Sequence, residues 1–479
     1  MTLYESYASD LSEAIAAGLF RPGDRLPSIR EACRQRGISP ATVFKAYYLL
    51  EAEGLIRAAP RSGYYVNARP TDRRLLEPKP SRPKTAGISI DTRDLVYDIH
   101  ASLKQRSGVP LGSPFIDPTF FPLDRLRQSL VAAMRRLDPW SSVVDLPPGN
   151  RALKRQIQKR YLAHGMKLAE SEIVLTNGAM PALDLCLAAV AKPGDSVVIE
   201  SPTFYVALQA LQRRSLKAIE VATDCGEGID LGRLAEVLEK RRPAACWLMT
   251  NFQNPLGSLM PDQKKRELVA LLAQHEVPLI EDDVYGELYQ GDVAPPSAKS
   301  FDRHGLVMHC ASFSKTLAPG YRVGWTAAGG FATQVERLKL STLLTGAIPT
   351  QAAIATYLQD GGYDSHLRRL RRTLADQQAV VVDAVHRYFP EGTRVSLPQG
   401  GYFIWLELPE PVDAVELFWA ASAQGISIAP GPMFSARGEF SHCIRLNTGQ
   451  VWSRKVEDAI VKIASLVAWQ MPRSSPSPH

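Results

Sequence analysis

One lysine of this chain stands among neighbours that suit covalent chemistry on an aldehyde. In the run SFSKTLAPGYRVGW, residues 312–325, Lys315 follows the hydroxyl residues Ser312 and Ser314, and Arg322 comes seven residues later. A lysine in an enclosed site can lose its proton and form an imine, and hydroxyls with a guanidinium fork suit a phosphate. The run therefore predicts an imine-forming lysine beside an anchored phosphate. The alternative is a solvated Ser-Lys loop followed by an exposed arginine.

Further polar residues follow the segments that we predict to be strands. From about residue 110, the stretches SEIVLT, DSVVIE, AACWLMT, VPLIEDD and GLVMHC alternate with helical patterns or glycine turns. This alternation predicts an α/β fold, with a mainly parallel sheet and helices on both faces. Ligands of such sheets bind at the carboxyl ends of the strands. Gly178, Asn254 and Asp282 all fall there, and a helix that starts near Pro181, after Gly178, would offer free N–H groups to a phosphate.

Together, these segments resemble the fold-type I pyridoxal-phosphate aminotransferases. The motifs TNGAMPALDL, NFQNPLG, LIEDDVYGEL, the lysine run and CIRLNTG stand in the family's order, and the resemblance covers roughly residues 110–467. It implies that residues 110–479 form an aminotransferase-like domain. Its large part would span about residues 140–340, and a smaller α+β C-terminal part would span about residues 341–470.

The resemblance also implies pyridoxal 5'-phosphate as the cofactor and gives each matching residue a role. Lys315 would carry the cofactor as an imine. Asp282 would keep the pyridine nitrogen protonated, which makes the ring an electron sink, and Arg445 would clamp an α-carboxylate through a bidentate fork. The remaining residues would hold the phosphate (Gly178, Ala179, Met180, Ser312, Ser314, Arg322), stack on the ring (Phe204) or reach the phenolic oxygen (Asn254, Tyr285).

Three of these roles have alternatives. Phe204 fits plain core packing equally well. Asp283 competes with Asp282 for the ring nitrogen, and we choose Asp282 because the family's tyrosine follows its carboxylate by three residues. Two acids at a strand end also often cap a helix. Arg445, on a predicted strand, could make an ordinary ion pair.

Residues 1–67 are predicted to form a winged helix-turn-helix. Apolar residues recur at helical spacing in the first segment, Gly37 breaks a second helix, and Ser39 can cap a third. Two short strands, around residues 55–58 and 64–66, would make the wing. The residues of the third helix that we expect on its inner face are Val43, Tyr47 and Leu50.

The run RPGDRLPSIREACRQRGISPATVFKAYYLLEAEGLI resembles the GntR-type DNA-binding domain, which implies a double-stranded DNA operator as partner. Pro40 stands where that family often has an arginine, so we expect one base contact to be lost and the target sequence to differ. The alternative is a helical adaptor that docks a protein. The DNA-binding residues that the resemblance implies are Arg30, Ser39, Thr42 and Lys45, with Arg61 and Gly63 at the wing tip.

The residues between the two predicted domains differ from both in composition. Residues 68–109 are predicted to be a basic, proline-rich linker, because proline spacing stiffens a segment and blocks regular structure. The net charge is +7, and residues 1–85 hold 14 Lys/Arg against 9 Asp/Glu. Such an excess indicates a nucleic-acid partner, although a solvated basic face gives the same count.

Six scattered cysteines predict neither a metal site nor disulfides. With no apolar run of ~18 residues and no apparent signal peptide, we expect a cytoplasmic protein, nucleoid-associated through DNA, with no membrane contact.

The two resemblances together point to the MocR subgroup of bacterial regulators, which are usually head-to-tail homodimers. They imply that an amino compound, or the cofactor itself, is sensed through the Lys315 imine, with a carboxylate on Arg445. Differential binding to two domain arrangements would then change operator affinity. The main alternative is a catalytically active aminotransferase with an accessory N-terminal domain. A third is an enzyme with a helical protein-docking module.

Overall fold

The computed structural model describes residues 2–17, 19–20, 24–52, 55–59, 63–66, 76–90, 108–141 and 149–472. Two compact units make up the chain. One contains Met1–Leu75 with Asp376–Tyr388, and the other contains Leu76–Ala375 with Phe389–His479. In the described part of the chain, no helix is long and apolar enough to span a membrane.

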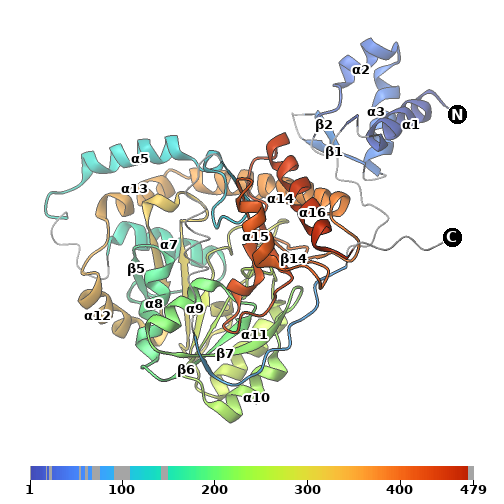
Figure 1. Cartoon of the computed structure of the whole chain (residues 1–479). Helices are drawn as coiled ribbons and strands as arrows, with labels where there is room; N and C mark the ends of the chain where they lie inside the picture. Colours follow the sequence, from blue (N-terminus) through green and yellow to red (C-terminus); the bar gives the residue numbers. More distant parts are fainter. Residues whose placement is uncertain are drawn as a thin grey trace. The chain divides into compact units, whose positions relative to one another are not determined.

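The N-terminal residues form three helices and a two-stranded hairpin (Figure 1). Ser28 starts the second helix with a capping box, because its hydroxyl accepts from the Glu31 amide while the Glu31 carboxylate accepts from the Ser28 amide. Gly37 ends this helix in the left-handed conformation, with φ 64°. The elements are α1 (Leu3–Ala16), α2 (Ile29–Arg36), α3 (Pro40–Ala52), β1 (Ile56–Ala59) and β2 (Gly63–Val66).

The core of this module lies under the third helix. Val43, Tyr47 and Leu50 of α3 are fully buried, as the apolar spacing predicts. The Tyr47 hydroxyl donates to the carbonyl of Pro27 at 2.7 Å, so the buried phenol keeps a partner. The winged helix-turn-helix fold is therefore confirmed. Arg61 lies outside the described residues.

The second unit is built on a nine-stranded sheet in the order β3-β7-β6-β9-β10-β11-β12-β5, with β8 paired to β7. Strands β7, β6, β9, β10 and β11 run parallel, whereas β12 is antiparallel to both of its neighbours. The mainly parallel sheet is confirmed. The strands are β3 (Ile88–Ser89), β5 (Ile173–Thr176), β6 (Ser196–Ser201), β7 (Lys217–Asp224), β8 (Gly228–Ile229), β9 (Ala245–Leu248), β10 (Leu279–Asp282), β11 (Val307–Ser312) and β12 (Gly324–Ala327).

Helices cover both faces of this sheet, because successive side chains of a strand point to opposite sides. In β6, Val197 and Ile199 face one helical layer, while Val198 faces the other. The layers are visible in Figure 1. The first consists of α8 (Ala179–Val190), α9 (Tyr205–Arg213) and α12 (Ala332–Thr342); the second contains α7 (Arg151–Ala163), α10 (Leu231–Arg241) and α11 (Asp262–Gln274).

A smaller α+β part completes this unit. Its sheet has the order β13-β14-β17-β16, and β15 pairs separately with β4. Helix α13 packs against α5 and α7. The strands are β4 (Val109–Pro110), β13 (Arg394–Val395), β14 (Phe403–Glu407), β15 (Ile426–Ser427), β16 (Ala429–Pro430) and β17 (Cys443–Asn447); the helices are α15 (Ala414–Ser422) and α16 (Arg454–Gln470). Helices α5 (Leu123–Arg136) and α13 (Ile348–Gln359) and the first part of α14 (Gly362–Tyr388) share a core with α7 and the main sheet instead, while Asp376–Tyr388 of α14 belong to the first unit.

Residues 76–90, inside the predicted linker, are tied to the second unit. The Ser81 hydroxyl donates to the carbonyl of Ser201 at 2.6 Å, and the Arg437 guanidinium donates to the carbonyl of Ala86 at 2.9 Å. Ile88–Ser89 then adds strand β3 to the edge of the main sheet beside β7. The expectation that proline spacing blocks regular structure is wrong for these two residues, since they follow the last proline of the stretch and find an open strand edge.

Candidate functional site

A cavity of about 210 Å³ lies at the carboxyl ends of β10 and β11. Residues far apart in the sequence meet there, because the parallel strands bring their ends to one edge of the sheet. Nine of the predicted site residues line it: Ala179, Met180, Phe204, Asn254, Asp282, Tyr285, Ser312, Ser314 and Arg322, together with Lys315 itself. The other lining residues are Pro114, Phe115, Leu183, Tyr205, Val206, Met249 and Val284.

Lys315 projects into this cavity between aromatic rings. Its ammonium nitrogen, Nζ, donates a hydrogen bond to the carbonyl of Pro114 at 2.8 Å. The same atom lies 4.7 Å from the ring centre of Phe115 and 5.6 Å from that of Tyr285. No acidic side chain in the described residues forms an ion pair with it. The hydrogen-bond partner of the Lys315 amine is therefore a neutral carbonyl rather than a carboxylate.

The surroundings of Lys315 favour its neutral form. Burial lowers the pKa of Lys315 to about 7, and the charges of Arg445 and Arg322 act in the same direction, while Asp282 opposes them. At neutral pH a large share of the amine is thus unprotonated, as a nucleophilic lysine requires. Burial also raises the pKa of Asp282 to about 7, and the neighbouring charge of Asp283 adds to this rise.

The two adjacent acids, Asp282 and Asp283, make different contacts. Asp282 is buried and lines the cavity, and its Oδ1 has no hydrogen-bond partner among the described residues. Asp283 faces away: its Oδ2 lies 2.9 Å from His309 Nε2, and its Oδ1 accepts from Asn251 Nδ2 at 3.1 Å. The carboxylate that is free to face a ligand in the cavity is therefore that of Asp282.

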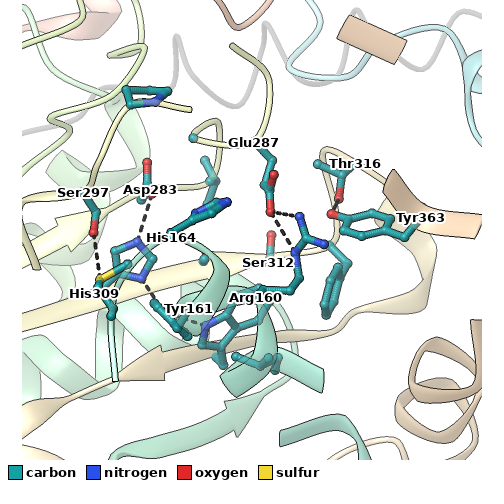
Figure 2. A pocket seen from close by; sticks show the side chains of 18 residues that line it. Arg160, Tyr161, His164, Asp283, Glu287, Ser297, His309, Ser312, Thr316 and Tyr363 are labelled. Atoms are coloured by element: carbon teal, nitrogen blue, oxygen red, sulfur yellow. Dashed lines mark hydrogen bonds and ion pairs between the residues drawn. The ribbon is translucent and has the colours of Figure 1, made fainter. Parts of the chain in front are cut away.

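Behind Asp283 lies a second, smaller cavity of about 70 Å³, shown in Figure 2. The His309 ring bridges Asp283 and Tyr161, because its Nδ1 lies 2.7 Å from the Tyr161 hydroxyl. That hydroxyl also accepts from Trp325 Nε1 at 2.9 Å. This buried chain of hydrogen bonds explains why Asp283 stays on its own side of the sheet. At the other end of the pocket, Arg160 pairs with Glu287.

At the opposite end of the main cavity, backbone and side-chain donors converge. Helix α8 begins at Ala179, directly after Gly178, whose φ of 96° favours glycine. Arg322 Nη2 donates to the carbonyl of Asn177 at 3.0 Å and lies so close to Gly178 that a Cβ there would clash with it. Ser314 Oγ is buried without a partner among the described residues. These groups form a corner of donors whose chemistry suits an anion.

Arg445 does not line the cavity but reaches it through Asn254. It is 1% exposed, and its Nη1 and Nη2 donate to Asn254 Oδ1 at 3.0 Å and to the carbonyl of Gly112 at 2.7 Å. The guanidinium lies 4.1 Å from the ring centre of Phe403. Arg445 Nε and Asn254 Nδ2 have no partner among the described residues. No acidic residue pairs with this arginine in the described part, so the ordinary ion pair does not form.

Phe204 and Tyr285 supply aromatic walls. Phe204 is half-buried, lines the cavity and meets Tyr205 edge-on, with ring centres 5.0 Å apart. It also packs with the hydrophobic cluster around Tyr285, so its role in stacking on a ligand stays a prediction. Tyr285 is buried, with its ring centre 5.5 Å from that of Tyr402.

Sequence reasoning missed the residues that hold the mouth of the cavity. The Tyr402 hydroxyl donates to the carbonyl of Pro114 at 2.9 Å, the same carbonyl that Lys315 contacts. Asn447 Nδ2 donates to the carbonyls of Ser113 and Phe115 at 2.8 and 2.7 Å. A signal for Asn447 does exist, because it stands two residues after Arg445 in CIRLNTG and so faces the same side of a strand.

The predicted cofactor, pyridoxal 5'-phosphate, can be tested against the partnerless atoms of this site. It presents a pyridine nitrogen, a phenolic oxygen, an aldehyde and a phosphate. The buried Asp282 Oδ1, Asn254 Nδ2 and Ser314 Oγ all lack partners in the described part of the chain and all border the cavity. Buried polar atoms normally find hydrogen bonds. An acceptor, a donor and a hydroxyl beside an amine match the four groups of this cofactor, so the residues fit it.

In the N-terminal module, the predicted DNA-binding residues lie on or near the α3 side. Arg30 and Lys45 are exposed, and Lys45 Nζ lies 5.7 Å from the ring centre of Tyr4. The Ser39 and Thr42 hydroxyls are 2.8 Å apart and share one hydrogen bond. Gly63 begins strand β2 with φ 114°, so the wing tip requires its freedom.

Comparisons with known proteins agree with this geometry. The family described as aminotransferase class I and II matches residues 143–463, and the bacterial regulatory proteins of the GntR family match residues 3–66. A relative from Escherichia coli strain K12, the uncharacterized HTH-type transcriptional regulator YdcR, is 47% identical over 98% of this chain and 99% of its own.

Two solved structures share the fold of the second unit. Kynurenine aminotransferase from Pyrococcus horikoshii, in complex with PMP, is 27% identical over 79% of this chain and 95% of its own, with a TM-score of 0.73. The α-aminoadipate aminotransferase LysN from Thermus thermophilus, complexed with N-(5'-phosphopyridoxyl)-L-leucine, is 26% identical over 78% and 94%, with a TM-score of 0.72. The fold-type I architecture is thus confirmed.

Proposed function

This chain belongs to the HTH-type transcriptional regulators in which a GntR-type domain precedes a class I and II aminotransferase domain, and we propose that it is a pyridoxal-phosphate-dependent regulator of the MocR type. Residues 1–67 bind operator DNA, residues 68–109 connect, and residues 110–479 hold the cofactor. The observation that carries the proposal is that one chain joins a helix-turn-helix with exposed basic side chains to a cavity whose partnerless atoms fit the cofactor.

The residues of the cavity divide the work of holding this cofactor. When bound, it supplies an aldehyde carbon and an electron-withdrawing ring. The Lys315 amine, about half neutral at pH 7, is the group that would bond to the aldehyde with loss of water, and Asp282 would hold a proton at the ring nitrogen. Asn254 and Tyr285 would face the phenolic oxygen, and Phe204 would cover the ring. The phosphate would be held by Gly178, Ala179, Met180, Ser312, Ser314 and Arg322.

The effector is an amino compound, or the cofactor itself. The amino group of this compound would replace the Lys315 amine, which would be released as a free amine, and a carboxylate on the same molecule would bind the buried Arg445 guanidinium. Such binding changes the affinity for DNA only if the effector binds one domain arrangement more tightly than another. The contact between Arg445 and Asn254 makes this preference physically reasonable, because it joins strand β17 to the segment after β9.

The chain is expected to act as a head-to-tail homodimer. Helix α5 supports this proposal, because Leu123, Val131 and Met134 are each at least 45% exposed and present apolar surface in the single chain. A two-fold dimer suits paired half-sites on DNA. Sedimentation of the full chain at micromolar concentration tests it, and a monomer at every concentration would contradict it.

One experiment separates the regulator from an enzyme with an accessory domain. Duplexes enriched from a randomised library by the full-length, cofactor-loaded protein serve as DNA probes, and their affinities are measured with apoprotein, with cofactor, and with cofactor plus a panel of amino acids. We expect the affinity for the enriched duplexes to change on loading or on amine addition. Rapid turnover of an amino acid with a keto acid, together with DNA affinities that never change, would support the aminotransferase instead.

A further inference from the structure

The exposed face of α3, the proposed recognition helix, carries two large aromatic side chains. Three α3 residues, Val43, Ala46 and Leu50, are fully buried against the module's core. Two aromatic residues point outward instead, since Phe44 is 53% exposed and Tyr48 is 66% exposed. Neither belongs to the module's core cluster. Large apolar side chains left in water on a short helix call for a ligand surface rather than a folding role.

Apart from Lys45, the first two turns of α3 carry few free hydrogen-bonding groups. Pro40, Ala41 and Phe44 are all exposed there and have no side-chain donor or acceptor. The polar residues between and before them, Ser39 and Thr42, share one hydrogen bond between their hydroxyls at 2.8 Å, which leaves one O–H free, and Ser39 Oγ also accepts from the Thr42 amide at 3.2 Å. The start of the helix therefore offers mainly carbon to whatever it docks against.

This surface limits which base edges the helix can recognise. The N-terminal residues of the second helix of a helix-turn-helix meet base edges in the major groove. Guanine presents acceptors that need a donor, usually arginine or lysine, whereas the C5-methyl of thymine is recognised by apolar contact. We propose that Phe44 is a specificity-determining residue, which packs against the methyl group of a thymine in the operator. This inference rests on the proposed function, because it takes DNA as the occupant of the helix face.

Charge identifies DNA rather than a protein as that occupant. Arg30 on α2 and Lys45, the next residue after Phe44, are both exposed and cationic. No carboxylate in the described residues forms an ion pair with either of them. Cationic side chains beside the apolar Phe44 suit a DNA groove, where phosphates flank the bases. Phosphate contacts position the helix, and base contacts specify the sequence.

A single-methyl substitution in DNA tests this assignment. Duplexes are enriched from a randomised library by the full-length, cofactor-loaded protein, and each thymine of an enriched duplex is then replaced in turn by deoxyuridine, which lacks only the methyl group. For the wild type, we expect at least one thymine per half-site at which the replacement weakens binding about threefold or more, the size expected for one buried methyl. For Phe44→Ala, thymine and deoxyuridine at that position should bind equally, and Phe44→Leu should keep part of the difference.

Tyr48→Ala is the matched control, because Tyr48 is an exposed aromatic one turn further along the same helix. It should keep the thymine preference of the wild type. The proposal is overturned if no thymine of the enriched duplexes is sensitive to loss of its methyl, or if Phe44→Ala keeps the same discrimination. A Phe44→Ala variant with unchanged DNA binding would mark this face as a protein-docking surface. If no duplex is enriched at all, the DNA-binding function itself fails, which is a distinct result.

Discussion

Arg445 Nη1 donates to Asn254 Oδ1 at 3.0 Å, and this bond joins the small α+β part to the main cavity. The same asparagine turns its partnerless Nδ2 toward the cavity. A ligand carboxylate that binds the Arg445 guanidinium must therefore either compete with the hydrogen bond that orients Asn254 or bind beside it. The effector-binding group and the cofactor-binding group are thus coupled by one hydrogen bond.

Replacing Arg445 with methionine should selectively weaken the binding of carboxylate-bearing amines. Hydrogen bonds to charged groups contribute about 1.5–3 kcal/mol, so the apparent affinity for an amino acid should fall roughly 10- to 100-fold. Titrations followed by the visible spectrum of the cofactor-loaded protein measure this. The control ligand is the corresponding decarboxylated amine, whose affinity should hardly change. Equal losses for both ligands would show that the substitution damages the cavity in general.

The neutral amine of Lys315 should give cofactor capture a distinctive pH profile. Because burial lowers the pKa of Lys315 to about 7, the fraction of reactive amine rises as pH increases through 7 and is nearly complete above 8. The rate at which the apoprotein captures pyridoxal 5'-phosphate, followed by absorbance, should rise and level off over the same interval. A rate that keeps rising toward pH 10 is the behaviour of an ordinary lysine and would contradict this prediction.

The tight approach of backbone at the phosphate corner should make Gly324 intolerant of any side chain. A Cβ on Gly324 would lie 2.5 Å from the carbonyl carbon of Gly178 and 2.8 Å from the amide nitrogen of Ala179, so the start of α8 would have to move. We expect Gly324→Ala to weaken cofactor binding about tenfold or more, because helix N-terminal amides must point at the phosphate. Equilibrium titration of the apoprotein measures the affinity.

The control for Gly324→Ala lies four residues earlier. A Cβ on Gly320 would have no atom within 4 Å, so Gly320→Ala should bind the cofactor as the wild type does. If the two variants lose affinity to the same extent, the loss reflects general strain in the segment rather than contact with α8.

Much of the fold and the cavity can be predicted from sequence, because the informative signals are local. The run around Lys315 suggests imine chemistry from its residue types, the role of Asp282 follows from the family resemblance, and the alternation of strand and helix patterns predicts the end of the sheet at which the two residues meet. Gly37 likewise marks the end of α2, as its sequence position predicts. The structure brings the cavity residues together, while their individual roles stay predictions.

What the sequence does not reveal are contacts between segments that are far apart along the chain. Nothing near Ser81 indicates that its hydroxyl meets the carbonyl of Ser201. Likewise, the choice between Asp282 and Asp283 depends on His309, which belongs to the neighbouring strand β11. Such contacts depend on sheet order and side-chain direction, which local patterns do not encode.

Replacing Asp282 with asparagine should remove a pH dependence from the stability of the apoprotein. Burial and Asp283 raise the pKa of Asp282 to about 7, whereas the unfolded chain ionises near the ordinary value of about 4. Between these values the folded state holds a proton that the unfolded state has lost, so the stability contribution of this group falls as pH rises, by about 3 kcal/mol from pH 5 to 8. Denaturant unfolding at both pH values measures it.

Asp283→Asn gives the matched comparison for Asp282→Asn. Removing the Asp283 charge should lower the pKa of Asp282, so the loss of stability on going from pH 5 to 8 should shrink without disappearing. In Asp282→Asn the contribution should vanish, because the asparagine does not titrate. If Asp283→Asn leaves the loss unchanged or enlarges it, the charge of Asp283 does not raise the pKa of Asp282, and its contact with His309 at 2.9 Å is the competing influence.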